Sequence, residues 1–171
     1  MRNLLISGLT VALLGCGQST GPVTAVGQSI YTADVQTVIA ENQGGGFVPP
    51  PPPGSPCQVG AAKYTLTVAT KLVSWTRCTA NGTGPNVQVM DMRVLTEGQF
   101  KELTPYLENL TVVPNDNSCG ADKPTLQVTI STPAGQQVYG DSFYACAIKD
   151  KPLVKSEALD SLLNELFKLT M

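Results

Sequence analysis

The chain has 171 residues, of which 42% are hydrophobic and 14% are charged, and its formal net charge is −2. Lysine and arginine are scattered along it, whereas a surface for nucleic acid or anionic lipid requires clustered positive charge. The chain has no histidine, which excludes Ser-His-Asp and Cys-His nucleophiles and histidine-containing zinc sites. These features indicate one folded domain without a nucleic-acid partner, a metal or a cofactor.

The first residues are typical of an export signal, because Arg2 precedes an apolar stretch too short to span a membrane. The junction Leu13-Leu14-Gly15-Cys16 resembles the lipobox of bacterial lipoproteins. This resemblance implies a signal peptide over residues 1–15 and a lipid-modified Cys16 that anchors the chain in a membrane. Because Gly17 rather than aspartate follows, the resemblance favours the outer membrane. It does not decide between the periplasmic and the surface face of that membrane. An ordinary cleaved signal is the alternative.

Cysteine usage agrees with export. Four cysteines remain beyond Cys16, an even number that favours two disulfides in an oxidising compartment. Three pairings are formally possible. If Thr132 and Gly135 flank a hairpin turn, Cys119 comes close to Cys146, and an earlier hairpin brings Cys57 towards Cys78. We therefore expect the disulfides Cys57–Cys78 and Cys119–Cys146.

Residues 16–56 are expected to form a lipidated N-terminus and a tether. Within them, 32–41 has apolar residues near one helical face, which predicts either a short helix or a transiently ordered segment. The triglycine at 44–46 is flexible, and the proline run at 49–53 favours a stiff polyproline II spacer. Proline runs also bind aromatic grooves, so partner binding is a second interpretation. The folded domain is expected over residues 57–171.

Alternating apolar residues predict strands at 64–69, 72–78, 87–95, 125–131 and 138–147. Thr96 and Gln99 form a capping box before a helical pattern, in which Pro105 predicts a kink or a break. A final leucine-rich helix is expected to be capped by Ser156, with Lys168 in its last turn. The predicted fold class is α+β: an antiparallel sheet of about five strands, two helices on one face and two disulfides.

Few residues favour catalysis. Gly140-Asp141-Ser142 lacks the glycines that follow in a serine-hydrolase signature, and a strand with a glycine bulge explains it. Asp91 and Asp141 could form a glycosidase-like carboxylate pair, but the sequence does not show that they meet. A further set of residues has both a ligand-binding and a structural interpretation. It comprises a calcium candidate that also fits an Asx-rich turn (Asp116, Asn117, Ser118, Asp122) and an aromatic platform that also fits the core (Trp75, Tyr139, Phe143, Tyr144).

The stretch from Cys119 to Cys146 resembles the bacterial subtilisin-inhibitor family. The resemblance is carried by Gly120-Ala121-Asp122-Lys123 after the first cysteine, by Pro124, and by Phe143 before the second. It implies an exposed loop that docks in a protease cleft and presents Ala121. The chain departs from the family because its other disulfide involves Cys57 rather than the helix, and because the loop is about one residue short.

We therefore expect an outer-membrane lipoprotein that acts as a non-catalytic binding or structural module of the cell envelope, with an envelope protein as partner. A surface-tethered protease inhibitor that uses the loop Gly120, Ala121, Asp122 and Lys123 is the first alternative. An envelope enzyme that depends on carboxylates is the second.

Overall fold

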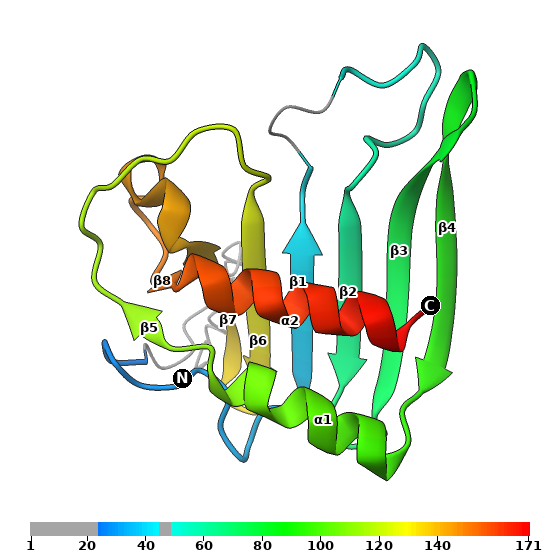
Figure 1. The fold of residues 1–171 in the computed structure, drawn as a ribbon. Coiled ribbons are helices and arrows are strands. Elements are labelled where there is room, and N and C mark those ends of the chain that lie inside the picture. Colours follow the sequence, from blue (N-terminus) through cyan, green and yellow to red (C-terminus); the bar gives the residue numbers. More distant parts are fainter. Residues whose placement is uncertain (1–23, 45–48) are drawn as a thin grey trace, which may run out of the picture.

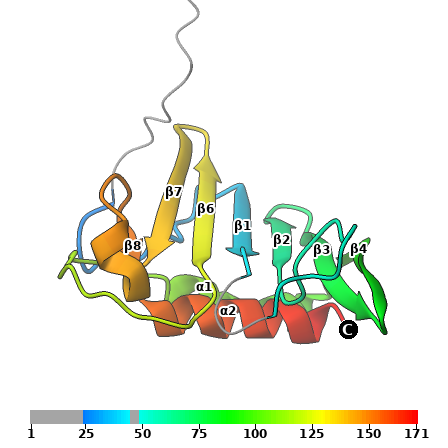
Figure 2. The ribbon, with the colours of Figure 1, turned by 90° about the horizontal axis from the view of Figure 1, so that it is seen from above.

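The computed structural model describes residues 24–44 and 49–171, so the predicted lipidation site, Cys16, lies outside the described residues. Eight strands form one sheet in the order β4-β3-β2-β1-β6-β7-β8-β5, and two α-helices cover one of its faces (Figures 1 and 2). The elements are β1 (Thr37–Asn42), β2 (Ala62–Thr67), β3 (Leu72–Asn81), β4 (Gly84–Val94), α1 (Glu97–Glu108), β5 (Val112–Val113), β6 (Leu126–Thr132), β7 (Gly135–Asp141), the 3₁₀ helix η1 (Ser142–Ala147), β8 (Leu153–Val154) and α2 (Ser156–Leu169).

The α+β class with both α-helices on one face is confirmed, but the expected sheet was too small. The sheet has eight strands rather than about five, and it is mixed because β7 and β8 run parallel. Two of the additional strands, β5 and β8, have only two residues each. Such short strands leave no alternating pattern in the sequence, which is why they were missed.

The short helix or transiently ordered segment expected over residues 32–41 is wrong, because these residues lead into β1. This strand lies inside the sheet and pairs antiparallel with both β2 and β6. Val38 and Ala40 are buried in the core, and Thr37 and Ile39 alternate with them on the other face. Two flanking strands from distant parts of the chain decided its conformation. The folded unit therefore includes residues upstream of Cys57.

The proline run lies in the connection between β1 and β2. We expected this run to be a spacer before a separate domain. This expectation is wrong, because both strands belong to one sheet. The loop is attached to the β3–β4 hairpin through Asn86. The backbone N–H of Asn86 donates to the Ser55 hydroxyl at 2.9 Å, and its side-chain amide donates to the Cys57 carbonyl at 3.0 Å.

Helix α1 begins at the predicted capping box. The Gln99 N–H donates to the Thr96 hydroxyl at 3.2 Å, and the Thr96 N–H donates to the Gln99 side chain at 3.0 Å. The sequence predicted a kink or a break at Pro105, and the break is wrong, because Pro105 lies inside one uninterrupted helix. Pro105 and Lys101 are both exposed. The Lys101 carbonyl that loses its helical partner therefore lies on the solvent side, where water can satisfy it.

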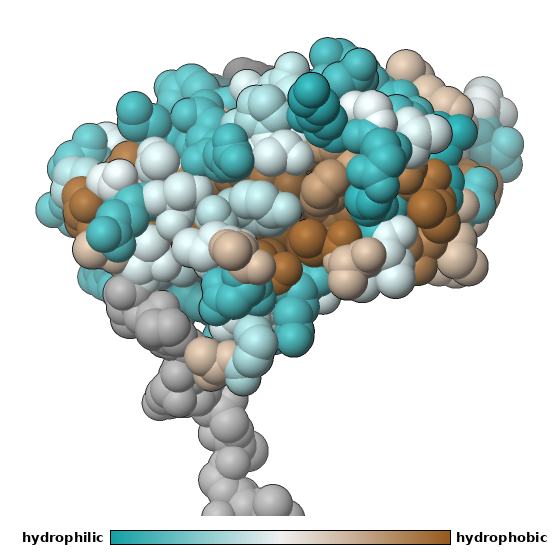
Figure 3. Space-filling view, turned by 90° about the horizontal axis from the view of Figure 1, so that it is seen from below, coloured by the Kyte–Doolittle hydropathy of each residue, from teal (hydrophilic) through white to brown (hydrophobic). Residues whose placement is uncertain are grey.

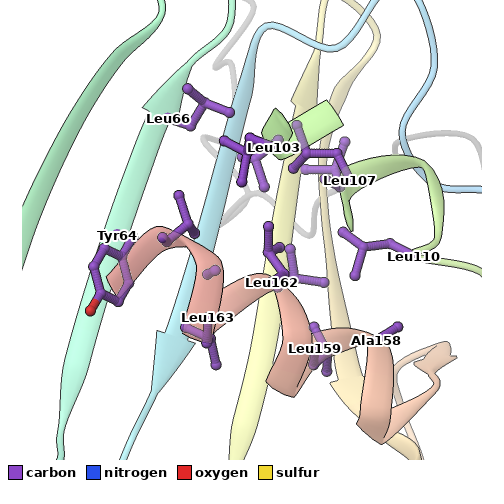
Figure 4. Close-up of a cluster of buried hydrophobic side chains, with 14 of the residues drawn as sticks. Tyr64, Leu66, Leu103, Leu107, Leu110, Ala158, Leu159, Leu162 and Leu163 are labelled. Atoms are coloured by element: carbon purple, nitrogen blue, oxygen red, sulfur yellow. The ribbon is translucent and has the colours of Figure 1, made fainter. Parts of the chain in front are cut away.

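Helix α2 buries the predicted leucine stripe, which comprises Leu159, Leu162, Leu163, Leu166 and Leu169. These side chains pack against Leu103 and Leu107 of α1 and against the sheet (Figure 4). Burying a leucine side chain fully contributes about 1.5–3 kcal/mol, so the layer between helices and sheet is the main source of stability. Ser156 was expected to cap this helix, but it is the first helical residue. The residue at the cap position is Lys155, and its side chain makes no capping hydrogen bond.

The strand expected over residues 138–147 ends early, at Asp141. The Asp141 carboxylate accepts a hydrogen bond from the Phe143 N–H at 2.8 Å, and this local turn starts η1. A side-chain cap of this kind competes with the strand ladder for backbone groups.

Both expected disulfides are present in the structure. Cys57 is joined to Cys78 with a Cα–Cα distance of 5.8 Å, and Cys119 is joined to Cys146 with a Cα–Cα distance of 5.2 Å. Both distances lie in the usual range for a disulfide.

Candidate functional site

The loop after Cys119 is exposed at its tip and fixed at both ends. Ala121 and Asp122 are exposed. On one side the Gly120 N–H donates to the Phe143 carbonyl at 2.7 Å, and on the other the Lys123 N–H donates to the Tyr144 hydroxyl at 3.2 Å. A short loop held between a disulfide and a hydrogen-bonded tyrosine is pre-organised, as a protease-binding loop must be.

Two features of the same loop argue against protease binding. Asp122 has a φ of 65°, which interrupts the extended backbone needed to add a strand inside a cleft. The Lys123 side chain is directed inward, where its ammonium group contacts both Ser156 and Asp160 and lies 5.2 Å from the centre of the Phe143 ring. Ala121 is therefore the residue that the loop presents, and Lys123 is not.

Sequence reasoning missed the contact between Lys123 and Ser156, because these residues lie on separate elements. A lysine beside a serine hydroxyl is one arrangement that activates a nucleophile. Here Ser156 is only 5% exposed, and the same ammonium group pairs with Asp160. Substrate has no access to such a hydroxyl, so we assign the cluster a structural role: it joins the loop to the first turn of α2.

The two candidate carboxylates do not meet. Asp91 lies on β4 and Asp141 on β7, and β3, β2, β1 and β6 separate these strands. Five strand spacings amount to about 24 Å, whereas a glycosidase pair requires about 5–9.5 Å. Asp141 is fully buried and caps η1.

The calcium candidate forms turns. Asn115 accepts from the Asn117 N–H at 2.8 Å, and Asp116 accepts from the Ser118 N–H at 2.9 Å. The hydrogen bonds from Ser118 lower the pKa of Asp116. Within residues 24–44 and 49–171, no three acidic or cysteine side chains gather as a metal site would require.

The four aromatic residues form no platform. Trp75 and Tyr139 belong to the core, while Phe143 and Tyr144 are partly buried and pack edge to face with ring centres 5.2 Å apart. The core interpretation is therefore confirmed for Trp75 and Tyr139.

Arg77 was not singled out by the sequence, yet it lies at the centre of an aromatic cluster. Its guanidinium carbon lies 5.4 Å from the ring centre of Tyr64, 5.2 Å from that of Trp75 and 4.7 Å from that of Phe167. Burial raises the pKa of Tyr64, and the charge of Arg77 opposes this shift. Tyr64, Arg77 and Phe167 line one side of a groove of about 200 Å³.

Two arginines hold the end of α2. Arg77 donates to the Thr170 hydroxyl, and Arg93 donates to the Leu169 carbonyl at 2.6 Å. Positive charge at a helix C-terminus is favourable because the helix dipole is negative there. This contact gives Arg77 a structural role that is sufficient to explain its environment.

Strand β4 forms one edge of the sheet, and its exposed apolar side chains are not explained by contacts within the fold. This strand of 11 residues pairs with β3 on one side only, and it carries exposed apolar side chains on both faces. The exposed fractions are 44% for Val87, 42% for Val89, 72% for Met90, 65% for Met92 and 66% for Val94. Hydrophobic side chains are visible at this end of the molecule, at the right of Figure 3.

The opposite edge of the sheet is covered. Residues 27–30 run beside β5, where the Gly27 N–H donates to the Val112 carbonyl at 2.8 Å and the Val112 N–H donates to the Gln28 carbonyl at 3.0 Å. Proteins commonly cover or shorten their edge strands, because an open edge pairs with other chains. Among the described residues, the fold covers one edge and leaves residues 88–94 of β4, its longest strand, open, whereas Asn86 at the start of β4 is bonded to Ser55 and Cys57.

The pairing of β3 with β4 determines which backbone groups of β4 are directed outward. The Leu95 N–H donates to the Lys71 carbonyl at 2.9 Å, so the pair Lys71–Leu95 is a hydrogen-bonded one. Hydrogen-bonded pairs alternate along an antiparallel ladder, so the odd-numbered residues of β4 bond to β3. The even-numbered residues, Gln88, Met90, Met92 and Val94, present their N–H and C=O groups to the open edge.

One of these outward N–H groups already has a partner, because the Met92 N–H donates to the Asp91 carboxylate at 2.7 Å. The sequence contained a signal for this surface that was not used. Apolar residues occur at both odd and even positions over 87–94, which indicates a strand apolar on both faces.

A comparison of the chain with protein-family models, with curated proteins and with solved structures found no match. In the part of the chain that the structure describes, no helix has the length and apolar character needed to cross a membrane.

Proposed function

We propose that this chain is a lipid-anchored, non-catalytic binding module of the bacterial cell envelope, attached to the outer membrane through Cys16. The observation that carries the proposal is the pairing of the other four cysteines with one another. None of them is left to pair with Cys16, which stands at the end of the lipobox-like sequence. An unpaired cysteine at that position is what lipid modification requires.

The binding surface in this proposal is the open edge of β4. Outward backbone groups supply hydrogen bonds to an added strand, and the exposed apolar side chains supply contact area. The candidate catalytic groups, by contrast, are far apart or inaccessible. Asp91 and Asp141 are separated by four strands, and the Ser156 hydroxyl is buried.

The anchor is tested by replacing Cys16 with serine in the full chain, followed by palmitate labelling and membrane fractionation. The wild-type protein is expected in the outer-membrane fraction with label, and Cys16→Ser in the soluble fraction without it. Both proteins should show the same thermal unfolding, because Cys16 lies outside the two disulfides. Membrane retention of Cys16→Ser, or an unlabelled wild-type protein, would refute the anchor.

Protease inhibition is a second candidate, favoured by the exposed Ala121 between Cys119 and the hydrogen bond at Lys123. It is tested by measuring inhibition of subtilisin- and trypsin-type proteases, with Ala121→Pro as control. Tight inhibition that the control abolishes would support this function, and proteases unaffected by the oxidised protein would discard it.

A further inference from the structure

We infer that β4 pairs antiparallel with β4 of a second copy of this chain, about a two-fold axis at Met92. The inference deepens the proposed function and rests on it, because it names the occupant of the open edge and depends on the anchor to concentrate the chain. The two sheets would continue into one another across the axis.

Hydrogen bonding restricts the register. The even-numbered residues of β4 direct their N–H and C=O groups outward, so an added antiparallel β4 must place even-numbered residues opposite even-numbered ones. A two-fold axis at any single residue satisfies this condition. The axis can therefore pass through several residues of β4, among them Met90, Asp91, Met92 and Arg93.

Charge selects one of these four registers. An axis at Asp91 places two aspartates opposite each other, and an axis at Arg93 does the same with two arginines. Like charges in directly opposite positions are unfavourable. An axis at Met90 places Asp91 opposite Val89. Only the axis at Met92 places Asp91 opposite Arg93, and two-fold symmetry makes this pair twice.

The same register gathers the exposed apolar side chains. Met92 meets its own copy on the axis, and Met90 meets Val94 of the second copy on either side. These residues lie on the sheet face away from the helices, because they are opposite Ser74, Thr76 and Leu72 in β3, whereas the buried Trp75 is opposite Asp91. Six side chains that are each more than 60% exposed in one copy would cover one another.

The charged groups are able to change partners. In the single chain, Asp91 accepts from the Met92 N–H. In the pair, the Met92 N–H donates to the Met92 carbonyl of the second copy, and Asp91 is released to contact Arg93. The guanidinium group of Arg93 has five N–H donors, and its contact with the Leu169 carbonyl uses Nη1.

The segment of the chain that precedes Thr24 does not fit this edge. Thr24 lies beside Tyr139 of β7, where the two hydroxyls are 3.0 Å apart, and β7 is five strand spacings, about 24 Å, from β4. After the proposed signal cleavage, residues 16–23 precede Thr24 and span about 26 Å when fully extended. Reaching β4 would use this whole segment and leave none to pair along the strand.

The pairing is short, since residues 90–94 of each strand are opposite one another. Contacts of this size are weak between proteins free in solution. Attachment to one membrane raises the effective concentration of the second copy, so the anchored protein is the form in which pairing is expected.

The register is tested by disulfide trapping in membranes that carry the full lipidated chain. Met92→Cys should form a disulfide-linked dimer at least tenfold more efficiently than Met90→Cys or Val94→Cys alone. Opposite residues in a hydrogen-bonded pair have Cα atoms about 5.5 Å apart, within disulfide range, whereas Met90 and its own copy would be about 14 Å apart. Producing Met90→Cys together with Val94→Cys should restore a cross-linked dimer.

Val26→Cys is the matched control, because Val26 is 62% exposed at the covered end of the sheet. No homotypic cross-link along β4, a maximum at residue 90, or cross-linking of Met92→Cys to a different protein would each overturn the inference. If the wild-type chain is not membrane-bound, the proposed anchor fails separately. The same variants are then compared as purified protein at high concentration, where absence of the cross-link at residue 92 again overturns the pairing.

A charge exchange provides the second measurement, by disulfide trapping through Met92→Cys in the same membranes. Asp91→Arg and Arg93→Asp should each reduce the dimer fraction at least tenfold, because each variant places like charges opposite each other. A mixture of the two variants should restore the dimer, because the two arginines of one copy then lie opposite the two aspartates of the other. A mixture that stays monomeric while both variants melt like wild type would contradict the register.

Discussion

A chain that begins at Cys57 should not fold, although the sequence pattern suggested that the domain begins there. Removing residues 24–44 deletes β1, which pairs over six residues with β2 and over six with β6. Both neighbours would then have unpaired edges in the interior of the sheet. The core would also lose Ile30, Val35 and Val38, which are at most 5% exposed.

The size of this effect follows from the buried side chains. Full burial of each of these three residues contributes about 1.5–3 kcal/mol, or about 5–9 kcal/mol together. The whole free energy of unfolding of a domain is about 5–15 kcal/mol. The loss of side-chain burial alone is thus comparable to the total stability, before any unpaired backbone group is counted.

The assay compares oxidised chains of residues 24–171 and 57–171 by far-ultraviolet circular dichroism and thermal unfolding. The longer chain should unfold cooperatively, and the shorter one should show no cooperative transition. Adding a peptide of residues 24–44 should restore the transition of the shorter chain. If 57–171 alone melts cooperatively, with a free energy of unfolding within about 1 kcal/mol of the longer chain, β1 does not support the core in this way.

Three further predictions concern stability. The variant Cys119→Ser/Cys146→Ser should have a free energy of unfolding about 3.5 kcal/mol lower than the wild type in urea, because this disulfide closes a loop with a sequence separation of 27. A decrease under about 1 kcal/mol would contradict the loop-entropy argument. Gly120→Ala places a Cβ atom 2.0 Å from an edge carbon of the Phe143 ring and should cost about 1–3 kcal/mol in thermal unfolding, whereas Gly98→Ala in the first turn of α1 should not destabilise. Equal effects of the two substitutions would exclude the clash. Burial raises the pKa of Tyr64 above its ordinary value of 10.0, so the unfolded chain loses this proton first and the free energy of unfolding should fall as the pH rises past 10.0. Urea titrations of Tyr64→Phe should show a smaller fall in this free energy, and a fall equal to that of the wild type would remove Tyr64 as its cause.

Features that depend on neighbouring residues could be predicted from the sequence. The capping box of Thr96 and Gln99, the leucine stripe of α2 and both disulfides occur in the structure as expected. A cap joins residues three apart, and a helical stripe repeats every three or four residues. The hairpin of β6 and β7 brings the segments that carry Cys119 and Cys146 to the same end, although Cys146 itself lies in η1 and not in the strand ladder. The information in each case lies within a short stretch of chain.

Features that depend on distant partners were decided by the tertiary structure. Residues 37–42 form a strand because β2 and β6 supply hydrogen bonds on both sides. The two-residue strands β5 and β8 are defined only by their pairing with each other and with β7. Pro105 remains in α1 because its side of the helix faces solvent.

The candidate binding surface shows the same division. The sequence determined that residues 87–94 are apolar at odd and even positions alike, a pattern that equally suits a strand covered on both faces in the middle of a sheet. Whether such a strand is central or at an edge depends on the order in which all the strands assemble, and that order is set by hydrogen bonds between segments far apart in the chain. Only the tertiary structure placed β4 at the edge, with its backbone groups directed outward and its methionines exposed.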